Sequence, residues 1–183
     1  MRTCLIPLLL LLSACSTPSI DLDYDPARTF SGYHDYAWAT PKLRYQPDDA
    51  RLTSDLTEQR ITSAVQAQLP MQGLVATTDG QPDVRVQATL ITETRQEQVT
   101  LNYGNGYGPY WGGFWGSPGI TETRSVPYKV AILQIDLLDG RDGKLVWRGS
   151  AEQVLSQTAL TPGEREAMIN TAVAKILAHY PPQ

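Results

Sequence analysis

The side chain with the most distinctive chemical setting is the thiol of Cys15, in a chain of 183 residues that contains two cysteines. It follows Leu12, Ser13 and Ala14, which themselves follow a basic start at Arg2 and an apolar run. A basic start, an apolar stretch and small residues at the exit are typical of a secretory signal. The apolar run is far shorter than the roughly 20 residues of a membrane-spanning helix, so the segment predicts export.

The four residues that end at Cys15 resemble the lipobox of bacterial lipoproteins, in which the cysteine is diacylated on sulfur and becomes the new N-terminus. The resemblance implies a signal peptide over 1–14, lipid attachment at Cys15 and a lipidated tether over 15–20. An ordinary signal peptide with an incidental cysteine is the alternative. Several acyl chains on one residue give stable anchoring, because each buried methylene adds roughly 0.8 kcal/mol.

The residue after the cysteine is Ser16. In lipoproteins of two-membraned bacteria an aspartate at this place resembles a signal for retention in the inner membrane. Ser16 therefore implies the outer membrane, with the domain facing the periplasm and the membrane as a partner through the lipid on Cys15. Cys4 would leave with the signal, so the mature chain would keep no free thiol and no disulfide. Cysteine nucleophiles and zinc–thiolate sites are thereby excluded.

A segment rich in glycine and aromatic residues, 102–119, is the strongest candidate for a binding site. Glycine costs backbone entropy, so such a loop is not built for stability. Exposed aromatic rings can bind a sugar face, a peptide or a lipid interface. We expect a partner-binding loop at a hairpin tip; the alternative is a tip that is disordered or folded back on the sheet. Its candidate contact residues are Tyr103, Tyr107, Tyr110, Trp111, Phe114 and Trp115.

Acidic residues recur at two places, but neither pattern predicts a metal site. An oxygen-ligand site usually needs more converging groups than one face of a solvated edge strand offers. The second group lies near a turn whose Asp-Gly pairs are explained by turn geometry, and it lacks the spacing of an EF-hand. The two groups are Asp21, Asp23 and Asp25, and Asp136, Asp139 and Asp142.

No motif in the chain predicts a catalytic residue or a cofactor. His34 and His179 are the two histidines, and His179 lies near a predicted helix end, where a positive charge is favourable. No serine lies in a Gly-x-Ser-x-Gly motif, and the alternating glycines at 104–108 lack the helix of a dinucleotide-binding loop. The sequence therefore favours a protein that is not an enzyme.

The elements that must position these residues follow from hydrophobic periodicity. Apolar residues at helical spacing predict a helix over 52–69, which Pro70 and Gly73 end. A second helix, 161–180, begins with a capping box at Thr161 and Glu164. Alternation and turn residues predict five strands and a loop at 41–49. The strands are 21–25, 33–39, 84–100, 121–138 and 145–155.

This order of elements predicts the fold class. About 169 residues would remain after processing, which suits a single domain over 21–183. The last three strands lack a crossover helix and can pair as an antiparallel meander. We expect an α+β two-layer sandwich, with a mostly antiparallel sheet of about five strands and two helices on one face. Trp38 and Trp147 are expected to fill the core under the helices.

The chain resembles a bacterial lipoprotein family, domain of unknown function 4136, over nearly its whole mature length. The resemblance is carried by Tyr-x-x-Tyr-Ala-Trp at 33–38, by Pro-Asp-Val-Arg-Val at 82–86 and by the stretch 135–149. The final Tyr-Pro-Pro at 180–182 fits as well, although the family more often has phenylalanine before the prolines. Membership would imply a periplasm-facing lipoprotein domain, with no known activity.

Three functions are compatible with these observations. The first is a non-enzymatic envelope domain that binds a protein, glycan or lipid partner through the aromatic segment. The second is an accessory subunit of an envelope assembly or transport complex. The third is a hydrolase of envelope polymers, which would need carboxylates distant in sequence to converge. The net charge of −4 disfavours a nucleic-acid partner.

Overall fold

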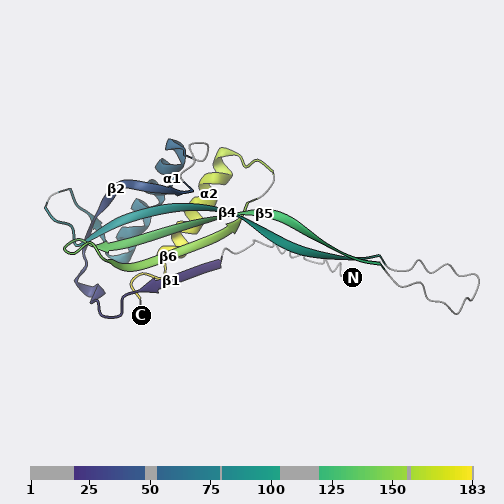
Figure 1. The fold of residues 1–183 in the computed structure, drawn as a ribbon. Coiled ribbons are helices and arrows are strands. Elements are labelled where there is room, and N and C mark those ends of the chain that lie inside the picture. Colours follow the sequence, from purple (N-terminus) through teal and green to yellow (C-terminus); the bar gives the residue numbers. More distant parts are fainter. Residues whose placement is uncertain (1–18, 48–52, 79, 104–119, 156–157, 183) are drawn as a thin grey trace, which may run out of the picture.

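A six-stranded sheet and two α-helices form the part of the chain that the computed structural model describes, residues 19–47, 53–78, 80–103, 120–155 and 158–182 (Figure 1). The helices are α1 (Asp55–Gln68) and α2 (Pro162–Leu177), and two short 3₁₀ turns are η1 (Phe30–Gly32) and η2 (Leu69–Gln72). The strands are β1 (Ser19–Tyr24), β2 (Asp35–Gln46), β3 (Val75–Ala76), β4 (Val84–Tyr103), β5 (Ile120–Asp139) and β6 (Leu145–Val154).

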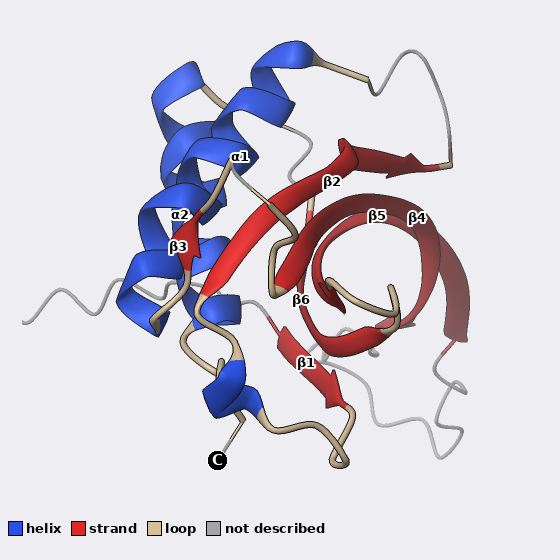
Figure 2. Cartoon of the chain, turned by 90° about the vertical axis from the view of Figure 1, so that its left-hand side faces the viewer, coloured by secondary structure: helices blue, strands red, loops and turns tan. Residues whose placement is uncertain are grey.

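The sheet has the order β1-β6-β5-β4-β2-β3, and both helices lie on one side of it (Figure 2). The expected meander of β4, β5 and β6 is confirmed, and so is the mixture of one sheet with two helices. The sheet has six strands where about five were expected, because the two-residue β3 adds one at the edge. β2 is parallel to both β3 and β4, since α1 carries the chain back across the sheet before β4 begins.

Local signals in the sequence set the ends of both helices. Ser54 caps α1 by accepting a hydrogen bond from the backbone N–H of Thr57. Thr161 accepts from the backbone N–H of Glu164, whose carboxylate accepts in turn from Thr161 at 2.7 Å. Gly73 ends the turn after α1 with a φ of 84°, a conformation that glycine adopts without strain. The predicted capping box and the predicted stop are therefore confirmed.

Strand β2 is longer than predicted, because it continues through most of the segment expected to be a loop at 41–49. Its pairing with β4 shifts register between Trp38 and Leu43, and this bulge accommodates Pro41. The side-chain amide of Gln87 donates to the carbonyl oxygen of Pro41 at 2.8 Å. Buried Leu43 then returns the strand to the core.

Strand β1 begins earlier than the predicted domain start at residue 21. Ser19 and Ile20 pair with Glu152 and Ala151 of β6, so the last part of the predicted tether over 15–20 belongs to the sheet. Ile20 packs against the hydrophobic core, which supplies the physical reason.

The core lies between the helices and the side of the sheet that faces them. Apolar side chains of both helices interleave with those of the central strands, and the aromatic rings of Trp147, Tyr180 and Phe30 close one end. The rings of Trp147 and Tyr180 meet edge to face at 5.6 Å between centroids. The fully buried members include Ile61, Val65, Val86, Ile135, Leu137, Val173 and Ile176.

The opposite side of the sheet carries a polar row instead. Asp23, Arg148, Asp136 and Gln87 are register neighbours across β1, β6, β5 and β4. Arg148 donates to both carboxylate oxygens of Asp136 at 2.7 Å, and this raises the pKa of Arg148. The sheet is therefore amphipathic, and its two faces explain why both helices lie on one side.

Helix α2 packs closely against the sheet at Gly149. A Cβ atom at this position would lie 2.6 Å from Ile176 Cγ2 and 2.6 Å from Trp147 Cη2. Gly149 therefore sets the distance between the helix and β6.

We predict that Gly149→Ala lowers the free energy of unfolding by about 1–3 kcal/mol, because the added methyl group overpacks the helix–sheet contact. The matched control is Gly163→Ala on α2, where a Cβ atom meets nothing within 4 Å. Urea unfolding measures both. Equal stability of the two variants would contradict the assigned close contact.

A charged cluster attaches the connection between β1 and β2 to the turn between β5 and β6. Arg28 donates to Asp139 at 3.0 Å and to Asp142 at 2.6 Å, and the hydroxyl of Tyr33 donates to Asp139 at 2.9 Å. Burial, together with the hydrogen bond to Asp139, raises the pKa of Tyr33 to about 12. The neutral phenol is therefore the form that the fold prefers.

We predict that alkaline pH destabilises the protein partly through Tyr33. The stabilisation is complete below the ordinary tyrosine pKa of about 10 and is lost as pH rises towards about 12. Unfolding free energies measured between pH 8 and pH 11 should fall less steeply in Tyr33→Phe than in wild type. Tyr24→Phe, at an exposed tyrosine, is the control. Identical slopes for Tyr33→Phe and wild type would show that Tyr33 does not contribute.

Candidate functional site

Two of the predicted functional features lie wholly or largely outside the described residues. These are the lipid attachment site Cys15 and the aromatic segment from Tyr107 to Trp115, which also contains Tyr110, Trp111 and Phe114. Asn102 and Tyr103 were expected to open the loop over 102–119, but their backbones belong to β4 and pair with Thr121 and Ile120. The described residues that flank the aromatic segment are the ends of β4 and β5.

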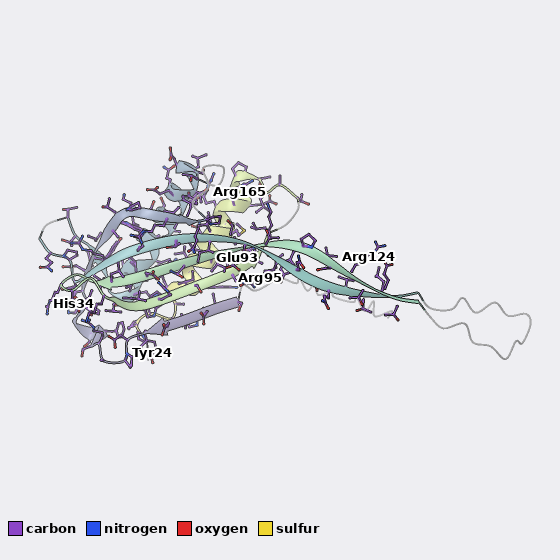
Figure 3. The ribbon with its side chains drawn as sticks, viewed as in Figure 1. Tyr24, His34, Glu93, Arg95, Arg124 and Arg165 are labelled. Atoms are coloured by element: carbon purple, nitrogen blue, oxygen red, sulfur yellow. The ribbon has the colours of Figure 1, made fainter. Side chains whose placement is uncertain are left out.

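The flanking strands form a long two-stranded ribbon, which we define as residues 94–103 of β4 and 120–129 of β5. The two strands pair residue by residue out to Tyr103 and Ile120. The other strand neighbours stop earlier, because β2 pairs with β4 as far as Ile91 and β6 pairs with β5 from Val130 onward. Figures 1 and 3 show the ribbon projecting from the body of the domain.

The ribbon exposes side chains on both faces, including the apolar Leu101 and Val126. Its root is held on the helix-free side, where both terminal nitrogens of Arg95 donate to the carboxylate of Glu152 on β6, at 2.6 Å and 2.8 Å. Glu93 accepts two further bonds from Arg95, from Nε at 3.3 Å and from Nη2 at 3.2 Å, and together the bonds to Glu152 and Glu93 raise the pKa of Arg95. Figure 3 labels Glu93 and Arg95 where the ribbon leaves the body.

Four of the six acidic residues, Asp25, Asp136, Asp139 and Asp142, accept hydrogen bonds in salt bridges with arginines. β1 is an edge strand, as expected, and its Asp21 and Asp23 lie beside Ser150 and Arg148 of β6. Asp25 follows β1 and accepts from Arg28 at 3.3 Å. The second group is split, because Asp136 pairs with Arg148 whereas Asp139 and Asp142 pair with Arg28. Within the described ranges, no three acidic, histidine or cysteine residues gather where they could hold a metal ion.

The histidines and the described tryptophans make contacts that belong to the fold. The ring of His179 donates through Nδ1 to the carbonyl oxygen of Lys175 at 2.9 Å, beyond the end of α2. The backbone N–H of His34 donates to the carboxylate of Asp83 at 2.9 Å. Trp147 is buried in the core as expected, and Trp38 packs against the core but is half-buried.

Sequence reasoning missed a cleft of about 260 Å³ between the sheet and the first turns of both helices. Its floor is formed by two register rows on the helix-facing side of the sheet, Leu90–Leu133–Ala151 and Thr92–Ala131–Gln153. Ile61 of α1 and Met168 and Ile169 of α2 line its walls. Arg60 and Arg165 are its charged lining residues.

The cleft forms because the helices extend beyond the part of the sheet that carries large buried side chains. Near Trp147 the sheet fills the space beneath the helices, whereas towards the ribbon its helix-facing positions are Ala151, Ala131 and Thr92. The small side chains at these three core-facing positions are the sequence feature that indicates the cleft. This feature could be recognised only once the register of the three strands was known.

Comparison with known proteins places the fold in a family. The family model described as a domain of unknown function (DUF4136) matches residues 20–182, so the chain belongs to this family. The family resemblance seen in the sequence is thus confirmed. A search of curated proteins finds no match. Neither described helix has the length and apolar character needed to cross a membrane.

Comparison with solved structures finds similarity at low sequence identity. A PDZ domain protein from Parabacteroides distasonis is 14% identical with a TM-score of 0.56, and the match covers 90% of this chain but 35% of that protein. The chain thus spans about a third of that protein, and the likeness shows the fold alone. A PelC dodecamer from Paraburkholderia phytofirmans is 12% identical with a TM-score of 0.45, covering 88% of this chain and 95% of that one.

We predict that Arg95→Ala loosens the ribbon, because the carboxylate of Glu152 then loses its bidentate partner across the sheet. Amide hydrogen exchange over 94–102 and 122–128 should become several-fold faster. Arg124→Ala is the matched control, since Arg124 pairs with Glu122 on the same strand at 2.7 Å and does not bridge to the body (Figure 3). Equal exchange in the two variants would contradict the role of Arg95 at the root.

Proposed function

We propose that this chain is a lipid-anchored domain of the bacterial cell envelope that binds a partner and catalyses no reaction. The signal-like start and the residues around Cys15 support the anchor, and Ser16 supports an outer-membrane position facing the periplasm. The lack of a nucleophile motif in the sequence supports binding rather than catalysis. A role as accessory subunit of an envelope complex is a special case of the same proposal.

The ribbon is the observation that carries this proposal. A two-stranded hairpin without a hydrophobic face is marginally stable in water. The outer halves of the twenty-residue strands β4 and β5 form such a hairpin, so they add little to the stability of the body. Among the described strands, residues 95–101 and 122–128 pair only with each other, which leaves one backbone edge open on each. Open edges accept an added strand from another protein through main-chain hydrogen bonds.

The aromatic segment supports the same partner site. In sequence it joins the two ends of the ribbon, between Tyr103 and Ile120. Aromatic anchors dominate the binding energy of many protein interfaces. We therefore propose a protein partner, which pairs with the ribbon edge and contacts Trp111 and Trp115.

We predict that a photo-crosslinking residue at Gln98 or Thr123, both exposed on the ribbon, captures the same protein partner in cells. The matched control is the same residue at Gln59, exposed on α1, which should not capture it. Trp111→Ser together with Trp115→Ser should reduce the yield. A yield from the ribbon no higher than from Gln59, or capture of glycan or lipid alone, would overturn the proposed protein partner.

A second arm of the experiment tests the anchor. Cys15→Ser should abolish incorporation of labelled palmitate and should move the protein out of the outer-membrane fraction, because the thiol is the site of acylation. The crosslinks should then weaken, since the domain is no longer held near its partner. Retention of the label in Cys15→Ser would refute the proposed lipid attachment.

A further inference from the structure

The cleft beneath the helices has the dimensions of a binding site for an alkyl chain. Its volume is about 260 Å³. A methylene group occupies about as much room as a water molecule, roughly 30 Å³, so the cleft has room for about eight or nine methylenes. Native interiors are close-packed and leave few voids of this size.

The walls of the cleft are chemically suited to such a chain. Leu90 and Leu133 rise from the sheet, and Ile61, Met168 and Ile169 face the same space from the two helices. Methionine is flexible and polarizable, so it adapts to an apolar guest of variable shape. Apolar walls with a small number of placed polar groups are the usual composition of a small-molecule site.

The charges of the cleft specify the head group. Arg60 and Arg165 line it, and no acidic residue does. Arg165 is exposed and uses Nε to donate to the carbonyl oxygen of Leu160 at 3.2 Å. Glu166 shares a separate polar groove with Arg60, and no salt bridge joins this pair in the described part of the chain. Guanidinium groups pair with carboxylate and phosphate through two parallel hydrogen bonds.

The position of these arginines matches the shape of the cleft. Both lie in the first halves of their helices, Arg60 on α1 and Arg165 on α2, above the part of the sheet that leads into the ribbon. Arg165 lies on the side of the body from which the ribbon projects (Figure 3). A ligand could therefore place its tail over Leu90 and Leu133 and its head beside the arginines.

We propose that this cleft binds a single alkyl chain of about eight to ten carbons that carries an anionic head group. The proposal is independent of the ribbon, because the residues that line the cleft lie outside the ribbon. The anionic head can be the carboxylate of a free fatty acid or the phosphate of a lipid fragment, and both present the same chemistry to the arginines.

The test is direct titration of the full chain carrying Cys15→Ser, so that no acyl anchor requires detergent. Calorimetry with decanoate and with decyl phosphate distinguishes the two sources of the anion. We expect saturable binding of at least one of them at one molecule per chain. 1-Decanol and decyltrimethylammonium should bind at least tenfold more weakly. Absence of anion binding, or equal affinity for the cationic amphiphile, would overturn the proposal.

Variants separate the head group from the tail. Arg60→Gln and Arg165→Gln should each weaken binding several-fold and together more than tenfold, whereas Arg124→Gln on the ribbon should leave it unchanged. Ala172→Leu should fill the cleft and abolish binding while the thermal midpoint stays within a few degrees of wild type. If Ala172→Leu does not fold, Ala131→Val replaces it as the cleft-filling variant, because it is a smaller change in the floor of the cleft. Undiminished binding in a folded cleft-filling variant would place the ligand elsewhere and refute the proposal.

Discussion

The close packing of α2 on β6 is the contact on which the rest of this structure depends. Gly149 lets Ile176 approach the sheet, Trp147 fills the space beside it, and Tyr180 closes the end of the core against the Trp147 ring. These groups lie on one side of the sheet, and the other side carries the salt bridge of Arg148 with Asp136. Because the apolar side chains of the main core lie on one face of the sheet, both helices pack on that face.

The length of the helices relative to the strands determines the two candidate functional features. β4 and β5 run well beyond the other strands, so their outer halves are exposed on both faces and form the ribbon. Nearer the body, the helices extend over Ala131 and Ala151, whose small side chains leave the cleft. Ribbon and cleft therefore adjoin at the same end of the domain, and Arg95 with Glu152 holds the ribbon root there.

The proposed roles of these features do not compete. A lipid on Cys15 would hold the chain at the membrane, and the ribbon would present open backbone edges to a protein. The cleft lies under the helices and would bind an amphiphile of the size that its volume allows. The family to which the chain belongs supplies a fold without an assigned activity, so the function must be argued from these surfaces.

The sequence by itself determined the elements and their local chemistry. Local steric and hydrogen-bonding rules act over a few neighbouring residues, so the features that they govern were predictable. These features are the helix cap at Thr161, the helix stop at Gly73 and the alternation in β4. The continuation of β2 past Pro41 was decided by tertiary contacts, since Gln87 satisfies the carbonyl of the bulge and Leu43 enters the core. The parallel pairing of β2 with β4 and the cleft were decided in the same way. They depend on how strands distant in sequence align, and no local pattern records that register.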